Sequence, residues 1–199
     1  MIFVWPFFLY KRYGRKDYRL EGRTIIVANH YSTFDPYFIY MIYRRKKIHF
    51  ITIVETKKRL LSRFATWLFD CIFIDNKSNH VLFFRQCVNV LKNDGILCIF
   101  PEGCINPQRA GFFDFKPAFI LLAKRTNAKI LPIYIYPELT AFKRSKLYIG
   151  DIIAPEEIKK YDDVEYACAF VQSKIMDYST EFDDGAMFKE FLDSLPPQT

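Results

Sequence analysis

The fold of this 199-residue chain can be worked out from one stretch, Arg23-Thr-Ile-Ile-Val-Ala-Asn-His-Tyr-Ser-Thr-Phe-Asp35. Residues 23–28 form a short run rich in β-branched and apolar side chains, which predicts a buried strand. Asn29 and His30 end that run, so we expect a loop at the carboxyl end of the strand. In layered α/β proteins, functional sites gather beyond the carboxyl ends of the strands, which makes this loop a candidate site.

A helix is predicted after this loop. Ser32 or Thr33 can cap its start, because both side chains accept hydrogen bonds from backbone N–H groups. The basic run at 44–47 closes the helix, since positive charge is favourable at a helix C-terminus. Four apolar residues share one face of this helix: Phe34, Phe38, Met41 and Ile42.

The same pattern of short apolar runs and longer periodic segments continues along the chain. Further strands are predicted at 48–54, 71–74, 96–100, 130–136 and 147–153, and further helices at 57–68, 81–91, 116–126, 170–178 and 187–195. This alternation predicts a single layered α/β domain with a mixed, largely parallel sheet flanked by helices. We divide it into an N-terminal membrane-contacting segment (1–22), a core (23–155) and a C-terminal helical, acidic extension of the same domain (156–199).

Composition narrows the classes of function. The chain is 51% hydrophobic and 26% charged, which excludes a disordered or collagen-like protein. It has seven glycines and neither GxxxxGK nor GxGxxG, so a glycine-rich nucleotide loop is not expected. Residues 1–150 hold 25 Lys/Arg and 10 Asp/Glu, whereas residues 151–199 hold 4 and 12. The basic part predicts an anionic partner, and charge alone leaves nucleic acid, an anionic membrane and a phosphorylated small molecule open.

Cysteine and histidine spacing gives no sign of a metal site. The five cysteines are odd in number and show no CxxC spacing, so we expect free, mostly buried thiols rather than disulfides or zinc ligands. Neither His49 nor His80 has a partner at a metal-binding spacing. We therefore expect no metal and no cofactor.

The N-terminal sequence and one internal segment predict contact with a membrane without crossing it. The apolar residues 1–10 precede basic residues, which reverses the order of a secretory signal, and no uncharged apolar run reaches about 17 residues. The 57–68 helix combines a basic start with an apolar face, a pattern typical of a helix in the membrane interface, although burial of that face in the core is the alternative. The predicted membrane-contacting residues are Trp5, Phe7, Phe8, Lys58, Arg59, Arg63, Phe64 and Trp67.

Three groups of residues at strand ends could carry chemistry. A histidine with an aspartate five residues later, as in His30 and Asp35, can pair one imidazole nitrogen with the carboxylate and leave the other as a base. Phe100-Pro-Glu-Gly103 places a carboxylate and a glycine after another predicted strand. Pro132 lies inside an apolar strand, where proline is costly unless its position is special.

These elements, in this order, resemble the glycerolipid acyltransferase family, which includes 1-acylglycerol-3-phosphate O-acyltransferase (lysophosphatidic acid acyltransferase). Four segments resemble the family's blocks: Asn29-His-Tyr-Ser-Thr-Phe-Asp35, which looks like NHxxxxD, Cys71-Ile-Phe-Ile-Asp75, Ile99-Phe-Pro-Glu-Gly103 and Ile130-Leu-Pro-Ile133. Phe115-Lys-Pro-Ala118 and Tyr148-Ile-Gly150 resemble weaker flanking signatures, so the likeness runs from about 19 to 155. The resemblance implies a glycerol-3-phosphate acyltransferase-like fold.

The resemblance also implies a reaction and roles. The chain would move a fatty acyl group from acyl-CoA or acyl-ACP to 1-acylglycerol-3-phosphate, giving phosphatidic acid. His30 would take the proton of the attacking hydroxyl, and Asp35 would hold the imidazole, as in a serine hydrolase with the substrate's hydroxyl in place of the serine. The residues implied to bind substrate are Asn29, Ser32, Asn76, Lys77, Phe100, Pro101, Glu102, Gly103, Lys116 and Pro132.

The chain departs from the family pattern at two positions. Asn76 stands where the family commonly has an arginine credited with holding the phosphate of the acceptor, and Lys77, Arg109 or Lys116 could replace it. Pro117 stands where glycine is usual. Alternatives are therefore transfer to another lysolipid or to a lipid amine, or a catalytically decayed protein that only binds membranes.

The predicted partners are the thioester donor, a lysophospholipid acceptor and an anionic membrane surface. Nucleic acid is not expected, because the aromatic residues alternate with aliphatic ones in core-like periods rather than with basic residues. The predicted location is the cytoplasmic face of the cell membrane, peripheral or monotopic and without a spanning helix.

Overall fold

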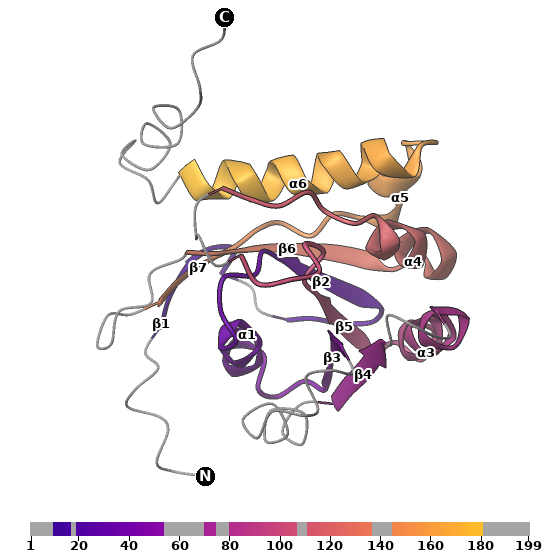
Figure 1. The fold of residues 1–199 in the computed structure, drawn as a ribbon, viewed down its shortest axis with the longest axis horizontal. Helices are drawn as coiled ribbons and strands as arrows, with labels where there is room; N and C mark the ends of the chain where they lie inside the picture. Colours follow the sequence, from indigo (N-terminus) through magenta and orange to yellow (C-terminus); the bar gives the residue numbers. More distant parts are fainter. Residues whose placement is uncertain are drawn as a thin grey trace, which may run out of the picture.

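A seven-stranded sheet forms the centre of the protein (Figure 1). The structure, a computed structural model, describes residues 10–16, 19–53, 70–74, 80–106, 111–136 and 145–180. Across the sheet the order is β1 (Tyr10–Gly14), β7 (Ser145–Ile149), β6 (Lys129–Ile135), β2 (Thr24–Ala28), β5 (Ile96–Ile99), β3 (Ile48–Ile53) and β4 (Asp70–Ile74). The last five strands in this order are parallel, β7 is antiparallel to β6, and β1 is parallel to β7. The predicted mixed, largely parallel sheet is confirmed.

Helices cover both faces of the sheet. On one face lie α3 (His80–Lys92), α4 (Ala118–Thr126), α5 (Pro155–Lys159) and α6 (Val164–Thr180), and on the other lies α1 (Asp35–Ile42). Figure 1 shows α6 above β6 and α1 below it. Each face of the sheet packs against its helices through its own hydrophobic core. The fold therefore has three layers, with the sheet between two layers of helices.

The central strand β2 supplies both cores with side chains. Ile25 and Val27 point into the core under α3, α4 and α6, whereas Ile26 and Ala28 point into the core under α1. All of them are wholly buried. A strand covered on both faces needs apolar residues at consecutive positions, which explains why its sequence does not alternate with polar residues.

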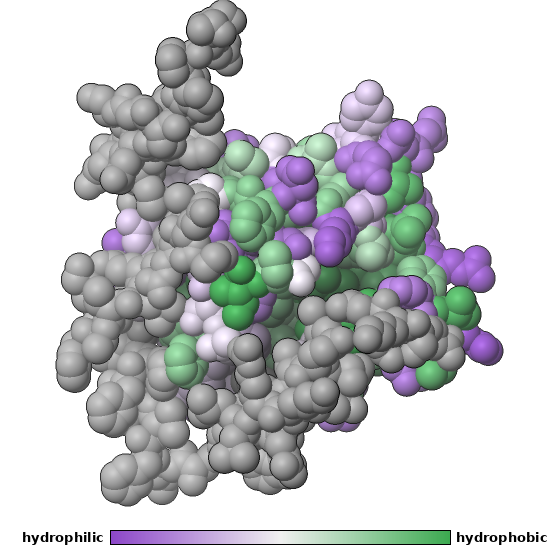
Figure 2. Space-filling view, in the orientation of Figure 1, coloured by the Kyte–Doolittle hydropathy of each residue, from purple (hydrophilic) through white to green (hydrophobic). Residues whose placement is uncertain are grey.

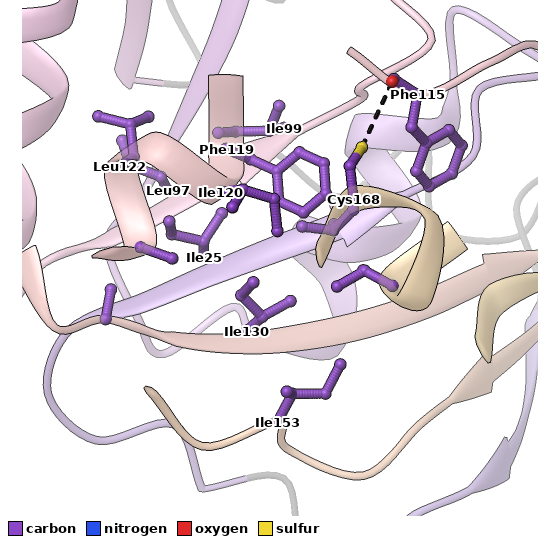
Figure 3. Close-up of a cluster of buried hydrophobic side chains, with 14 of the residues drawn as sticks. Ile25, Leu97, Ile99, Phe115, Phe119, Ile120, Leu122, Ile130, Ile153 and Cys168 are labelled. Carbon is purple, nitrogen blue, oxygen red and sulfur yellow. Dashed lines mark hydrogen bonds between the residues drawn. The ribbon is translucent and has the colours of Figure 1, made fainter. Parts of the chain in front are cut away.

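Figure 3 shows the larger of the two cores, where α4 and α6 meet the sheet. Phe119 and Ile120 of α4 lie against Ile25 and Leu97, which come from neighbouring strands. Several aromatic and β-branched side chains here have no exposed surface. Packing of this kind holds the layers together. All five cysteines are free, and the described residues contain no cluster that could hold a metal ion.

Two crossover connections identify the crevice beyond the carboxyl ends of the strands. The chain leaves β2 through α1 to β3, and leaves β5 through α4 to β6. β2 and β5 are neighbours, but these connections run in opposite directions across the sheet and over opposite faces. In α/β sheets the crevice at such a reversal, beyond the carboxyl ends of the strands, is the usual ligand site. Here it lies between the loops that follow Ala28 and Ile99.

The start of α1 differs from the sequence prediction. The helix begins at Asp35 with Phe34 at the N-cap position and no side-chain capping bond, so the predicted cap by Ser32 or Thr33 was wrong. The Oγ of Ser32 instead accepts a hydrogen bond from the Phe34 N–H. The carboxylate of Asp35 accepts the N–H groups of residues 31 and 32, so the turn before the helix is organised around Asp35.

Other boundaries also differ. β7 ends at Ile149 rather than at 153, and Ile153 forms only an isolated bridge with Ile130. β1 and α5 were not predicted, because β1 is a largely exposed, polar edge strand and α5 has only five residues. The predicted helices at 57–68 and 187–195 and the apolar segment 1–9 lie outside the described residues.

The described helices form layers that cover the sheet. α6 buries Ala167, Cys168, Val171 and Ile175 against the sheet. Figure 2 shows hydrophilic and hydrophobic side chains interspersed along the outer side of the molecule near α6. Within the described parts of the chain, none of the helices combines the length and apolar character needed to span a membrane.

The core under α4 generates a stability prediction. Phe119→Ala should lower the free energy of unfolding by about 3–5 kcal/mol, because a wholly buried ring is replaced by a cavity. Urea denaturation followed by circular dichroism measures the change. Leu121→Ala on the same helix is the control: its side chain is 46% exposed, so its effect should stay below about 1 kcal/mol. Equal losses from both variants would contradict the assignment of the core face.

Candidate active site

His30 and Asp35 lie in contact at the carboxyl end of β2. The Nδ1 atom of His30 is 2.9 Å from Oδ2 of Asp35, and the side chains are 16% and 1% exposed. An ionised carboxylate only accepts hydrogen bonds, so this contact favours the tautomer with the proton on Nδ1. The other ring nitrogen, Nε2, then carries a lone pair, and within the described part of the chain it makes no hydrogen bond.

Backbone groups hold Asp35 in place. Its Oδ2 atom accepts hydrogen bonds from the N–H groups of Tyr31 and Ser32, each at 2.7 Å, in addition to the contact with His30. Asp35 is also the first residue of α1, where the helix dipole favours negative charge. A buried carboxylate needs such compensation, because its removal from water is costly.

Phe100 fixes the plane of the histidine ring. The two rings are stacked, with centroids 4.2 Å apart and planes inclined by 19°. Phe100 directly follows β5, so the stack joins the loops after two neighbouring strands. Together with the Asp35 contact at Nδ1, it restricts the directions in which Nε2 can point.

Glu102 and Asn106 hold the backbone of His30 from the same second loop. Oε1 of Glu102 accepts the His30 N–H at 2.8 Å, and the Asn106 N–H donates to the His30 carbonyl at 2.7 Å. The other Glu102 oxygen accepts the Phe113 N–H at 3.1 Å. Glu102 is only 3% exposed, and burial raises its pKa, although the two backbone donors act in the opposite direction. Both of its oxygens are therefore used within the protein.

Asn29 joins the end of β2 to β6. Its side chain has no exposed surface, its Nδ2 donates to the Ile135 carbonyl at 2.8 Å, and its Oδ1 accepts the Ile135 N–H at 2.7 Å. Pro132 is also buried, in register with Val27. It lies just before the β6–β7 ladder, which begins at Ile133, so its missing N–H does not interrupt that ladder.

The loop after β5 brings a cation to the site. Gly103 has φ of +74°, which explains the glycine, and its N–H donates to the Phe100 carbonyl. A Cβ atom at Gly103 would lie 2.7 Å from Nζ of Lys116, so the exposed ammonium lies directly against this glycine. The Lys116 N–H in turn donates to the Pro101 carbonyl at 3.0 Å.

The structure thus brings together most of the predicted site residues that it describes. The contact expected between His30 and Asp35 is present, with Phe100, Glu102 and Gly103 beside it, whereas their roles stay predictions. Other predicted residues lie outside the described parts of the chain: Asn76, Lys77 and Arg109, and all of the membrane-contacting set.

A family model described as Acyltransferase matches residues 10–136 of this chain. The chain belongs to the acyltransferase family. The matched region includes the loops after β2 and β5 and ends just after β6. It leaves β7, α5 and α6 of this acyltransferase outside the family model.

Two curated relatives and one solved structure show the same likeness. The chain is 27% identical over 129 residues to acl-2 of Caenorhabditis elegans and 30% identical over 134 residues to a Mycoplasma genitalium protein. Both carry the name 1-acyl-sn-glycerol-3-phosphate acyltransferase as a provisional assignment. Each match covers 61% of this chain, but only 43% and 47% of the respective relatives, so this acyltransferase matches less than half of their length.

The solved structure is the 1-acyl-sn-glycerophosphate (LPA) acyltransferase PlsC from Thermotoga maritima. The TM-score is 0.70 at 22% identity, and the match covers 90% of this chain and 74% of that chain. The predicted fold class is confirmed by this likeness, which reaches beyond the family model.

Sequence reasoning missed several residues that build the site of this acyltransferase. Tyr31 and Phe113 contribute through their backbone N–H groups, so the type of side chain carries no signal for this contact. Asn106, which is 1% exposed, is also a backbone donor to His30. Gln172 of α6 lies 142 positions after His30 in the sequence and is connected to the site only by the fold.

The buried amide of Asn29 generates a second prediction. Asn29→Ala should lower the free energy of unfolding, because it leaves the N–H and carbonyl of Ile135 without partners at about 1–3 kcal/mol each. Chemical denaturation measures the loss. Asn93→Ala, whose exposed amide bonds only to Asn89 one turn earlier, is the matched control and should be nearly neutral. A neutral Asn29→Ala would show that the two Asn29–Ile135 hydrogen bonds contribute nothing to stability.

Proposed function

We propose that this protein transfers a fatty acyl group from an acyl thioester to the free hydroxyl of 1-acylglycerol-3-phosphate, forming phosphatidic acid. The observation that carries the proposal is the His30–Asp35 contact, in the crevice between β2 and β5, with Nε2 making no bond within the described residues. Membership of the acyltransferase family and the names of two curated relatives support the reaction and the acceptor.

The geometry suits general base catalysis by His30. Nε2 takes the proton from the acceptor hydroxyl as its oxygen forms a bond to the thioester carbonyl carbon. The tetrahedral intermediate then collapses, the carbon–sulfur bond breaks, and the proton passes to the departing thiolate. Asp35 stabilises the imidazolium between these steps, and no covalent enzyme intermediate is needed. The donor is a thioester of CoA or of acyl carrier protein.

Lys116 is the best-placed described cation for the acceptor's phosphate. Its exposed ammonium lies against Gly103, the residue after Glu102, and both Glu102 oxygens are already bonded to backbone N–H groups. We therefore assign phosphate recognition to Lys116, in place of the arginine that Asn76 replaces. Lysine acts as a point charge rather than as a bidentate fork, so other anionic or zwitterionic lysolipids are plausible additional acceptors.

We also propose that the carboxyl edge of the sheet faces a lipid surface on the cytoplasmic side of the membrane. Phe34 and Phe113 are 43% and 39% exposed, and each is a close sequence neighbour or hydrogen-bonding partner of a site residue. Exposed aromatic rings beside a lipid-handling site are favourable at a membrane interface. The predicted contacts at 1–10 and 57–68 would extend this surface.

The reaction is tested with a panel of lysolipids and both types of thioester. His30→Ala should reduce the turnover by about 10²–10⁴-fold, because the general base is lost. His80→Ala, an exposed histidine at the start of α3, is the control and should retain wild-type activity. Equal turnover by wild type and His30→Ala would refute the mechanism. Preference for a lysolipid other than 1-acylglycerol-3-phosphate would favour the alternative acceptor, and liposome binding without any turnover would favour a decayed enzyme.

The acceptor site is tested separately at Lys116. Lys116→Ala should raise the KM for 1-acylglycerol-3-phosphate by about 10- to 100-fold, since a hydrogen bond to a charged group contributes about 1.5–3 kcal/mol. The KM for a monoacylglycerol, which has no phosphate, should not change. Lys92→Ala at the end of α3 controls for a general loss of positive charge. Equal increases in KM for both acceptors would contradict a phosphate-binding role.

A further inference from the structure

A single glutamine on α6 bonds to the segment that follows the Glu102 loop. Oε1 of Gln172 accepts the Phe115 N–H at 3.2 Å, and its Nε2 donates to the Phe113 carbonyl at 3.3 Å. One side-chain amide therefore pairs with a backbone donor and a backbone acceptor on either side of Asp114, as a neighbouring strand would. We call residues 113–116 the acceptor segment.

Phe115, within the acceptor segment, is also held in the core. The Sγ atom of Cys168, one helical turn before Gln172, lies 3.3 Å from the Phe115 carbonyl, as Figure 3 shows. The Phe115 ring is 5% exposed and packs in the core together with Cys168 and Val171. α6 thus bonds to both backbone groups of Phe115 and to the carbonyl of Phe113.

The acceptor segment carries groups that act at the site. The Phe113 N–H donates to Glu102, whose second oxygen accepts the His30 N–H. Lys116, at the other end of the segment, donates its N–H to Pro101 and lays its ammonium against Gly103. Displacement of the segment would therefore move the proposed phosphate-binding cation and leave an oxygen of a buried carboxyl without its partner.

From these contacts we infer that Gln172 is a positioning residue, which sets the affinity for the acceptor by holding the acceptor segment and with it Lys116. The amide is suited to this task because it donates and accepts at once. A carboxylate at the same place could accept from Phe115 but would face the Phe113 carbonyl with no proton to give. The part played by Lys116 rests on the proposed function, whereas the hold on the segment does not.

This gives α6, the last described helix, a role in the active site. The family model ends at 136, so α6 lies outside the region that this model matches. Gln172 does not contact the reacting groups. It acts on the acceptor indirectly, by holding the Phe115 N–H and the Phe113 carbonyl and so positioning Lys116.

Hydrogen exchange and acceptor binding test the inference on the full chain. Gln172→Ala should speed amide exchange in peptides that cover 111–116, and should weaken binding of lysophosphatidic acid, measured without a thioester so that no turnover occurs, by about tenfold. Gln172→Glu should show the same direction, and it retains the size of the side chain if the alanine variant folds poorly. Ser173→Ala is the matched control, because its exposed hydroxyl bonds only within α6, to the Phe170 carbonyl.

A double variant separates positioning from general destabilisation. If Gln172 acts through Lys116, Gln172→Ala combined with Lys116→Ala should bind lysophosphatidic acid no more weakly than Lys116→Ala alone, and binding of a phosphate-free monoacylglycerol should be unchanged in all variants. Unchanged exchange at 111–116, unchanged affinity in Gln172→Ala, or additive losses in the double variant would overturn the inference. Wild-type binding of the acceptor with no thioester-dependent transfer would instead refute the proposed reaction and leave the inference standing.

Discussion

The carboxylate of Asp35 is buried at the carboxyl edge of the sheet. The structure of the site follows from the need to replace the hydrogen bonds that this carboxylate would make with water. A single oxygen accepts two backbone N–H groups and the imidazole Nδ1, and the side chain is 1% exposed. For two consecutive backbone N–H groups to reach that oxygen, the chain between β2 and α1 must turn tightly around it. This turn places His30 where its Nδ1 reaches the same Asp35 oxygen. The electrostatic requirement thus determines both the start of the helix and the orientation of the histidine.

A second constraint acts on the backbone of His30 rather than on its ring. The N–H bonds to Glu102 and the carbonyl to Asn106, both from the loop after the neighbouring strand. The two loops that leave β2 and β5 in opposite directions are therefore fastened to each other at the residue proposed as the base. Because Glu102 also bonds to Phe113, its carboxyl joins the loop after β2 to two parts of the connection between β5 and α4, and its burial is tolerated only while those donors are present.

Prediction from sequence succeeded where a local pattern has one physical explanation. Consecutive apolar residues in β2 indicate burial on both faces, and the five-residue separation of His30 from Asp35 permits the contact that the structure shows. It failed where the stabilising partner is distant. β1 has an exposed, polar sequence and is a strand only because β7 pairs with it. The expected Ser32 or Thr33 cap was wrong because the helix begins only at Asp35, whose N–H bonds to the Ser32 carbonyl rather than to a capping side chain. No local pattern marks Gln172 in the sequence, because its partner, the acceptor segment, comes beside it only in the fold.

The groups at the site divide into buried and exposed sets, and the two sets tolerate substitution differently. Asp35, Glu102 and Asn29 are each at most 3% exposed and are bonded mainly to backbone, so their replacement would leave backbone groups or a carboxyl unpaired. Lys116 and Phe113 are exposed and can change without unpairing any group in the core. Under the proposed function, the reaction therefore depends on the buried set, whereas the choice of acceptor depends on the exposed set. Under the proposed function, Asn76, at a position where the family commonly has arginine, changes acceptor recognition and not the His30–Asp35 contact.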